Sequence, residues 1–147
     1  MKSRIATVLA VIAALALSGC ASVPMADSSQ DVSAKTFAAP RDKAGVYIYR
    51  NETFGAAVKM DVFVDGRPLG ETVAKSYFYV EVEPGARTVM GKSENESSVS
   101  FQALAGRLYF IWQEVKMGFL YARNELKLVD EKEGRAGVLE SQRIMSK

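Results

Sequence analysis

The stretch Val58-Lys59-Met60-Asp61-Val62-Phe63-Val64-Asp65-Gly66-Arg67-Pro68-Leu69 carries the pattern that decides the fold. Every second residue from Val58 to Val64 is apolar, so these side chains would share one face of an extended strand. Asp65-Gly66 is typical of a two-residue hairpin turn, because glycine tolerates a positive φ. The chain continues as a short strand from Arg67 to Val73, where Pro68 indicates the edge of a sheet. The stretch therefore predicts an antiparallel β-hairpin.

The same period of two continues on both sides of this hairpin. Val46 and Ile48 would face one side of a strand, with Tyr47 and Tyr49 on the other side. Leu108 to Val115 is apolar on both faces, which is typical of an inner strand that is covered on both sides. Further strands and turns of this kind are predicted at Phe78–Val82, Arg87–Lys92, Val99–Ala103, Pro84-Gly85 and Ala105-Gly106.

These patterns predict an all-β fold, a small antiparallel β-sandwich of about seven to eight strands. No helical crossover connects the expected strands, so we expect no parallel pairing. A short helix is expected only at the C-terminal end, from Asp130 to Met145, with Asp130 as its cap and Glu133 three residues later. Gly134 and Gly137 would weaken that helix.

The N-terminal segment has the features of a bacterial export leader. A cationic start precedes the apolar run Ile5 to Leu17, and Leu17-Ser18-Gly19-Cys20 follows and resembles the lipobox of bacterial lipoproteins. The resemblance implies cleavage between Gly19 and Cys20 and a lipid (diacylglyceryl and palmitate-type chains) on Cys20. An ordinary secretory leader with a chance cysteine, or a short membrane anchor, are the alternatives.

The sequence thus divides into three parts. Residues 1–19 are expected to be a signal peptide, residues 20–42 a lipidated flexible tether, and residues 43–147 the β-sandwich domain. Because no Asp follows Cys20, the resemblance favours the outer membrane of the cell envelope, with the domain facing the periplasm. The membrane is therefore the first expected partner.

Composition removes several classes of function. The chain has 19 Lys and Arg, 17 Asp and Glu, one cysteine and no histidine, and two of the basic residues, Lys2 and Arg4, lie in the leader. The remaining neutral domain lacks the basic footprint that nucleic-acid binding needs. Metal sites built on His or Cys and nucleophilic sites that need His are excluded. We expect no cofactor and no metal.

Four tyrosines form the first candidate binding site. Tyr47 and Tyr49 alternate with apolar residues in one strand, and Tyr77 and Tyr79 do so in another that could be its neighbour. An exposed tyrosine face could bind a glycan, a small ligand or a protein partner. The alternative is a second packing layer, covered by the tether or by the C-terminal segment, and this alternative is favoured.

The second candidate is the polar end of the inner strand, Trp112-Gln113-Glu114-Val115-Lys116. Trp112, Gln113, Glu114 and Lys116 could form a recognition cluster facing the loop Ser93-Glu94-Asn95. The favoured alternative is structural: the strand emerges into solvent at Glu114, or Glu114 pairs with Arg50 or Arg123.

Catalysis could only come from carboxylates, and we expect that the protein is not an enzyme. Asp61 and Asp65 share a strand face, and Glu94 and Glu96 share a loop, so either pair could act in a hydrolase. Both pairs are also explained as solvent-facing residues, because nothing places one carboxyl in an apolar pocket.

Two family resemblances follow from these residues. Val62–Thr72 and Val82-Glu83-Pro84-Gly85 resemble the surface-associated PEGA repeat, which implies a PEGA-like or transthyretin-like sandwich. From about Lys43 to Leu139 the chain is similar to the small bacterial lipoproteins catalogued as domain of unknown function 2846. The strings that carry the second resemblance are Gly45–Arg50, Lys92–Asn95 and Tyr109–Gly118.

The second resemblance implies an envelope lipoprotein and brings no activity with it. Together with the neutral surface, it leads us to expect a binding or scaffolding module. Such a module would contact another envelope protein through an exposed strand edge or through the tyrosine face.

Overall fold

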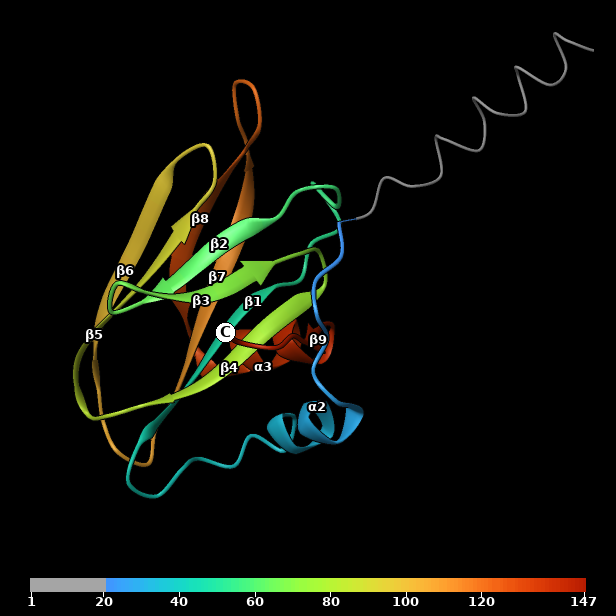
Figure 1. The fold of residues 1–147 in the computed structure, drawn as a ribbon. Helices are drawn as coiled ribbons and strands as arrows, with labels where there is room; N and C mark the ends of the chain where they lie inside the picture. Colours follow the sequence, from blue (N-terminus) through green and yellow to red (C-terminus); the bar gives the residue numbers. More distant parts are fainter. Residues whose placement is uncertain (1–20) are drawn as a thin grey trace, which may run out of the picture.

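The computed structural model describes residues 21–147, and in them two β-sheets pack face to face (Figure 1). The first sheet has five strands in the order β8-β7-β1-β4-β9, and the second has four in the order β3-β2-β5-β6. The strands are β1 (Ala44–Arg50), β2 (Met60–Val64), β3 (Arg67–Thr72), β4 (Ser76–Val82), β5 (Gly85–Lys92), β6 (Glu96–Ala103), β7 (Leu108–Met117), β8 (Ala122–Val129) and β9 (Gln142–Arg143), with helices α2 (Ser28–Ala34) and α3 (Glu131–Leu139). The predicted all-β sandwich is confirmed.

The hairpin that the sequence predicted is formed by β2 and β3. Asp65 and Gly66 both have positive φ, 48° and 77°, which is the geometry of the tight turn whose twist matches its strands. The strand begins at Met60 rather than Val58, and the pairing shifts by a bulge between Val62 and Phe63. β3 is an edge strand, as Pro68 indicated.

Two parallel pairings correct the expectation of a purely antiparallel sandwich. β1 runs parallel to β7, with Gly45 opposite Leu108 and Tyr49 opposite Trp112, and β4 runs parallel to β9. A parallel pair needs a long connection, which is usually a helix. Here the four strands of the second sheet, together with β4, form the connection between β1 and β7, so no helix was required.

The main core fills the space between the two sheets. β1, β4 and β7 of the first sheet contribute one face each, and β2 and β5 cover them from the second sheet. The fully buried members are Val46, Ile48, Val62, Phe78, Val89 and Ile111. The faces that the alternation assigned to Val46, Ile48 and Val62 are therefore correct.

A second apolar layer covers the outer face of the first sheet. Tyr47, Tyr49 and Tyr77 are at most 2% exposed there, packed with Phe110 and with Ala34 of α2 and Val138 of α3. Figure 1 shows both helices on this side of the sheet. The exposed tyrosine face is therefore overturned, and the favoured packing-layer interpretation is confirmed.

Part of the expected tether is folded onto the domain, which corrects its description as flexible. α2 lies within it, and Asp31 of α2 accepts hydrogen bonds from the Tyr77 hydroxyl at 2.8 Å and the Arg143 amide at 2.9 Å. Met25 forms an isolated antiparallel bridge with Ile144. The helix could not be predicted from the sequence, because a helix of seven residues is stabilised by such tertiary contacts rather than by its own helix propensity.

α3 confirms that a helix lies near the C-terminal end, but this helix is shorter than the predicted one. The Asp130 carboxylate accepts a hydrogen bond from the Glu133 amide at 2.9 Å, as the capping pattern predicted. The helix ends at Leu139, because the following residues pair with the sheets. No helix within residues 21–147 is both long and apolar enough to cross a membrane.

Candidate functional site

The two sides of the sandwich differ in how they are closed. Along one side, β6 and β8 are joined by side chains: the Leu126 amide donates to Ser97 Oγ at 3.0 Å. Nearby, Asn95 Nδ2 donates to the Asn124 carbonyl at 2.9 Å, and the Asn124 amide donates to Asn95 Oδ1 at 2.8 Å. This side of the sandwich is sealed.

The opposite side, between β3 and β4, is only partly closed. β9 pairs with Ser76 and Tyr77 alone, so within residues 21–147 the rest of β4 has no strand on its outer side. The Ile144 amide donates to the Tyr77 carbonyl at 3.0 Å, which shows that odd-numbered residues of β4 direct backbone groups outward. Tyr79 and Glu81 therefore present backbone groups to this opening, although the Tyr79 carbonyl also accepts Arg143 at 3.4 Å.

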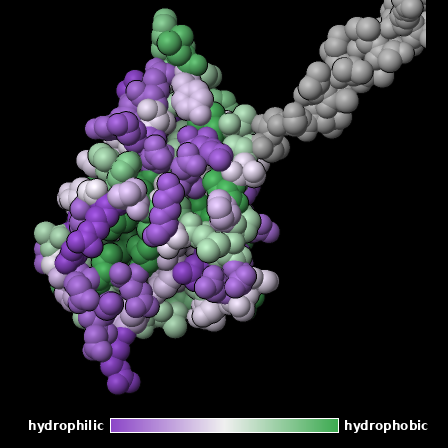
Figure 2. Space-filling view, viewed as in Figure 1, coloured by the Kyte–Doolittle hydropathy of each residue, from purple (hydrophilic) through white to green (hydrophobic). Residues whose placement is uncertain are grey.

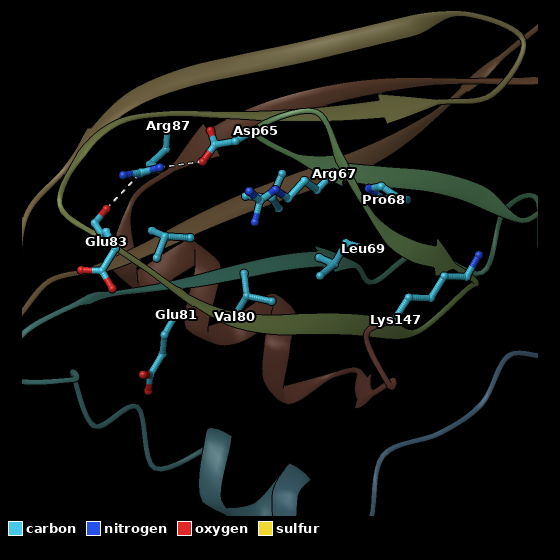
Figure 3. A pocket seen from close by; sticks show the side chains of 11 residues that line it. Asp65, Arg67, Pro68, Leu69, Val80, Glu81, Glu83, Arg87 and Lys147 are labelled. Atoms are coloured by element: carbon cyan, nitrogen blue, oxygen red, sulfur yellow. Dashed lines mark hydrogen bonds and ion pairs between the residues drawn. The ribbon is translucent and has the colours of Figure 1, made fainter.

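The last residues of the chain cover part of the opening. They run from β4 towards β3, where the Lys147 amide donates to the Leu69 carbonyl at 2.9 Å. Next to Lys147, which is one of its lining residues, a cleft of about 420 Å³ remains between β3 and β4. Figure 3 shows it with Arg67, Pro68 and Leu69 from β3 on one wall and Val80, Glu81 and Glu83 on or next to β4 on the other.

The cleft combines an apolar floor with a charged rim. Leu69 is buried, Val64, Val80 and Val82 are half-buried, and all four belong to or pack against the main core. The rim carries both signs of charge, and none of its lining residues is aromatic. These rim residues are Asp65, Arg67, Glu81, Glu83, Arg87 and Lys147. Clefts of this size with such a lining bind small ligands or the side chains of a peptide.

Part of the rim charge is held by pairing. Arg87 Nη1 lies 2.8 Å from Asp65 Oδ2, and Arg87 Nε donates to the Glu83 carbonyl at 2.9 Å. Burial alone would raise the pKa of Asp65, but the hydrogen bonds from Arg87 and the Thr88 amide outweigh it and hold that pKa below its usual value. Three acidic and three basic side chains line the rim, so it is close to neutral, which suits a peptide better than a strongly charged ligand.

The four tyrosines are structural. The Tyr47 hydroxyl donates to the Ala34 carbonyl at 2.6 Å, and Tyr77 donates to Asp31. Burial raises the pKa of all four phenols, that of Tyr79 to about 12. These contacts hold α2 against the first sheet, and the four tyrosines form no exposed aromatic face for a glycan.

The polar string of β7 is divided between the two faces of the strand. Gln113 is fully buried, and its Oε1 accepts the Thr72 hydroxyl at 2.6 Å, while its Nε2 lies 3.4 Å from Asn124 Oδ1. Glu114 and Lys116 lie on the opposite face, so the proposed recognition cluster does not form. The residue that reaches the Ser93–Asn95 loop is Asn124, through Asn95.

Glu114 takes part in a charged ladder on the outer surface of β7 and β8. Its carboxylate lies 2.8 Å from Lys116 Nζ and 2.5 Å from Lys127 Nζ, so its partners are lysines and not Arg50 or Arg123, which were one of the two structural alternatives. Hydrogen bonds from both lysines lower the pKa of Glu114. Lys127 also lies 5.1 Å from the ring centre of Trp112, so Trp112 belongs to this surface as well. The ladder is a structural ion-pair network.

The carboxylate pairs do not form a site together. Asp65 is paired with Arg87, and Asp61 is exposed on β2. Glu96 lies 3.3 Å from Lys92, whereas Glu94 accepts three backbone hydrogen bonds from the β7–β8 loop. In residues 21–147 no three His, Cys, Asp or Glu side chains are placed to hold a metal ion. Gly19 and Cys20 lie outside the described residues.

Sequence reasoning missed the cleft because its two walls come from different sheets. One signal was available, since Pro68 indicated that β3 was an edge strand. β9 leaves β4 partly uncovered, and a strand of two residues is too short to produce a recognisable pattern in the sequence.

Two comparisons place the chain among known proteins. Residues 40–124 match the family described as protein of unknown function (DUF2846). An uncharacterized protein of Haemophilus influenzae is 35% identical over 127 residues, which cover 85% of this chain and 76% of that protein. The match spans β1 to β7 and the start of β8, and so includes both walls of the cleft. The chain belongs to the DUF2846 family.

Proposed function

We propose that this protein is a lipid-anchored module of the bacterial cell envelope that binds an extended segment of another envelope protein. The segment lies in the cleft between β3 and β4 and pairs with a strand edge. The observation that carries this proposal is the asymmetry of the sandwich: β6 and β8 are sealed by side-chain hydrogen bonds, whereas β3 and β4 leave a cleft between two strand edges. Unpaired strand edges are templates for an added strand.

The protein's own chain supports this mode of binding. The Lys147 amide pairs with the Leu69 carbonyl on the edge of β3, and the Ile144 amide pairs with Tyr77 on β4. A backbone that crosses between the two edges is therefore already accepted next to the cleft. A partner segment continues the same kind of pairing along Tyr79 and Glu81, with an apolar side chain on the floor at Leu69 and Val80.

The lining disfavours a sugar as the occupant. Saccharide sites stack their rings on aromatic side chains, and none lines this cleft. The tyrosines that were the basis for glycan binding are buried under α2 and α3. A peptide, by contrast, takes its affinity from main-chain hydrogen bonds and its specificity from shallow apolar pockets.

Lipid attachment at Cys20, the outer-membrane location and the periplasmic orientation rest on the leader and the lipobox-like Leu17–Cys20. The likeness of Val62–Thr72 to the PEGA repeat likewise stays a prediction. For the anchor, we expect Cys20→Ser to abolish labelling by radioactive palmitate and to change membrane fractionation. If Cys20→Ser leaves lipid labelling intact, the lipid anchor is refuted.

The cleft is tested by photo-crosslinking in the cell. A benzoylphenylalanine at Glu81, which is exposed on the cleft wall, should crosslink to a defined envelope protein, and mass spectrometry should map the attachment to one short segment. The control carries the same group at Ser98, exposed on β6 on the sealed side. A synthetic peptide of the mapped segment should then shift NMR resonances of β3 and β4 and leave those of β6 and β8 unchanged.

Two variants sharpen the test. Glu81→Pro removes an outward N–H group. We expect this change to lower the affinity for the peptide about fivefold to tenfold, which corresponds to the loss of one net hydrogen bond. Val80→Trp fills the floor of the cleft and should abolish binding. The proposal is wrong if both crosslinker positions yield the same products, or if the peptide binds Glu81→Pro and Val80→Trp as tightly as the unaltered protein.

A further inference from the structure

The β7–β8 hairpin ends in an apolar tip. Its four-residue loop, Gly118–Tyr121, connects Met117 to its partner Ala122. Met117 is 80% exposed, Phe119 91% and Leu120 87%, and Tyr121 is half exposed. Figure 2 shows this hydrophobic group at the top of the molecule, where the hairpin of Figure 1 ends. Hairpin loops are normally polar, so a loop of this composition indicates a surface that is covered in use.

The tip has a fixed shape. The Glu94 carboxylate accepts the amides of Phe119 at 2.9 Å, Leu120 at 3.1 Å and Tyr121 at 2.7 Å. A β-carbon on Gly118 would overlap the Tyr121 carbonyl, so the loop requires glycine there. Three backbone donors at the tip are thus satisfied within the protein, which lowers the cost of placing this loop in a medium poor in water.

A second loop adds to the apolar surface. Phe54, 52% exposed, and Gly55 share a shallow hollow of about 300 Å³ with residues 116–122. The buried Arg50 guanidinium fixes this second loop by donating to the carbonyls of Val58 at 2.7 Å and Gly55 at 2.6 Å. The apolar surface therefore extends from the hairpin tip to Phe54.

The same end of the molecule receives the N-terminal segment. The Ala21 amide donates to the Ala56 carbonyl at 3.2 Å, two residues from Phe54. Ala21 directly follows Cys20 in the sequence. The described part of the chain therefore begins next to the loop that carries Phe54.

We propose that this tip, formed by Met117, Phe119, Leu120, Tyr121 and Phe54, inserts into the interface of the lipid bilayer. This proposal rests on the lipid anchor of the proposed function. The anchor holds the domain at the membrane, and Phe54 of this tip lies two residues from Ala56, which binds the amide of Ala21. A projecting turn of aromatic and aliphatic side chains with satisfied amides fits the headgroup boundary, where such side chains reach a depth of roughly 5–10 Å.

Insertion of the tip sets the orientation of the peptide cleft. The register Ala44 to Val82 and Arg50 to Ser76 places the end of β4 at the opposite end of β1 from Arg50. The cleft walls at Val80–Glu83 and Val64–Arg67 therefore lie away from the tip. With the tip in the bilayer, the cleft faces the aqueous space, where a protein segment can reach it.

The experiment uses the full chain, purified in detergent and reconstituted into vesicles of phosphatidylethanolamine and phosphatidylglycerol. Phe119→Cys carries an environment-sensitive nitrobenzoxadiazole label, and Leu120→Cys is a second test position. Leu104→Cys is the control, because Leu104 is an apolar surface residue, 52% exposed, that lies near the opposite end of β7. Spin-labelled lipids serve as quenchers, and Cys20 does not react with the label where it carries a thioether-linked lipid.

We expect labels at residues 119 and 120 to be blue-shifted and quenched to about half or less, because interfacial insertion brings them within roughly 5–10 Å of the acyl boundary. The label at residue 104 should be unaffected. Equal quenching at 119 and 104, or no quenching at 119 and 120, overturns the proposal. A blue shift without lipid quenching also overturns it and assigns the tip to a protein partner.

The anchor is judged separately by lipid labelling of Cys20→Ser. Loss of lipid labelling in Cys20→Ser together with unquenched tip positions refutes the insertion and leaves the anchored module intact. Retained lipid labelling in Cys20→Ser refutes the anchor, whatever the tip does.

Discussion

Gly134 of α3 lies directly against the ring of Phe110 in β7, so close that a β-carbon on the glycine would overlap the aromatic side chain. Gly137 stands in the same relation to Tyr49 in β1. The two glycines are three residues apart and therefore share one face of the helix. They let α3 approach the sheet closely enough to bury the second apolar layer.

Gly134→Ala should destabilise the fold, although alanine is the better helix former by about 1 kcal/mol. The overlap with Phe110 costs about 1–3 kcal/mol in overpacking, so after the gain in helix propensity we expect a net loss of up to about 2 kcal/mol in the free energy of unfolding by urea. Lys132→Ala, on the exposed side of α3, is the control and should stay within about 0.5 kcal/mol. A stabilising Gly134→Ala would contradict the close contact.

The buried Thr72–Gln113 hydrogen bond offers a second test. Thr72→Val keeps the shape but removes the donor to Gln113 Oε1, and should cost about 1–3 kcal/mol because a buried acceptor is left without it. Thr88→Val is the matched control, since Thr88 is exposed and hydrogen-bonds Ser100 at the surface. If the two variants lose the same free energy of unfolding, the buried network does not have this role.

Asp31 should make the packing of α2 sensitive to acid. Burial would raise the pKa of this carboxyl, but hydrogen bonds from Lys35, Tyr77 and the Arg143 amide outweigh it and lower the pKa below its ordinary value of 3.8. A carboxyl with a lowered folded pKa stabilises the protein above its unfolded pKa, and loses this contribution as pH falls through the folded value.

Asp31→Asn should therefore reduce the free energy of unfolding at pH 6 by about 1 kcal/mol, and by less once the pH falls well below 3.8. Denaturation at a series of pH values measures the difference between the two proteins. Asp42→Asn, in the exposed segment before β1, is the control. A difference that does not shrink with acidification would show that the Asp31 charge is not involved.

Glu94→Ala tests how the hairpin tip is held. Removing the carboxylate frees the amides of Phe119, Leu120 and Tyr121, so their hydrogen exchange should accelerate several-fold while exchange in the core strands is unchanged. Glu96→Ala, which loses only an exposed ion pair with Lys92, should leave the tip amides unaffected. Unchanged exchange at residues 119–121 in Glu94→Ala would contradict the structural role of Glu94.

The strands were predictable because alternation is a local property. Val46, Ile48 and Phe78 carry their face assignment in their spacing, and Asp65-Gly66 carries its turn in its backbone preference. The cap of α3 at Asp130 was equally local. The pairing of β1 with β7 was not predictable in this way, because it joins residues about sixty positions apart with no signal that links them.

The candidate sites also show that local patterns were predictable and long-range contacts were not. The sequence could show that four tyrosines share one face, but not that α2 and α3 cover that face. It could show polar groups in Trp112–Lys116, but the partners of Gln113 and Glu114 come from β3 and β8. Neither the cleft nor the proximity of Ala21 to the apolar tip has a sequence pattern.

By itself, the sequence determined the strands, the tight turns, the helix cap, the absence of histidine and the neutral charge of the part that follows the leader, because each depends on neighbouring residues or on a count. Only the tertiary structure decided which faces are covered, which strand edges stay open and which loops lie together. These depend on contacts between residues far apart in the chain, and such contacts follow from how apolar faces pack.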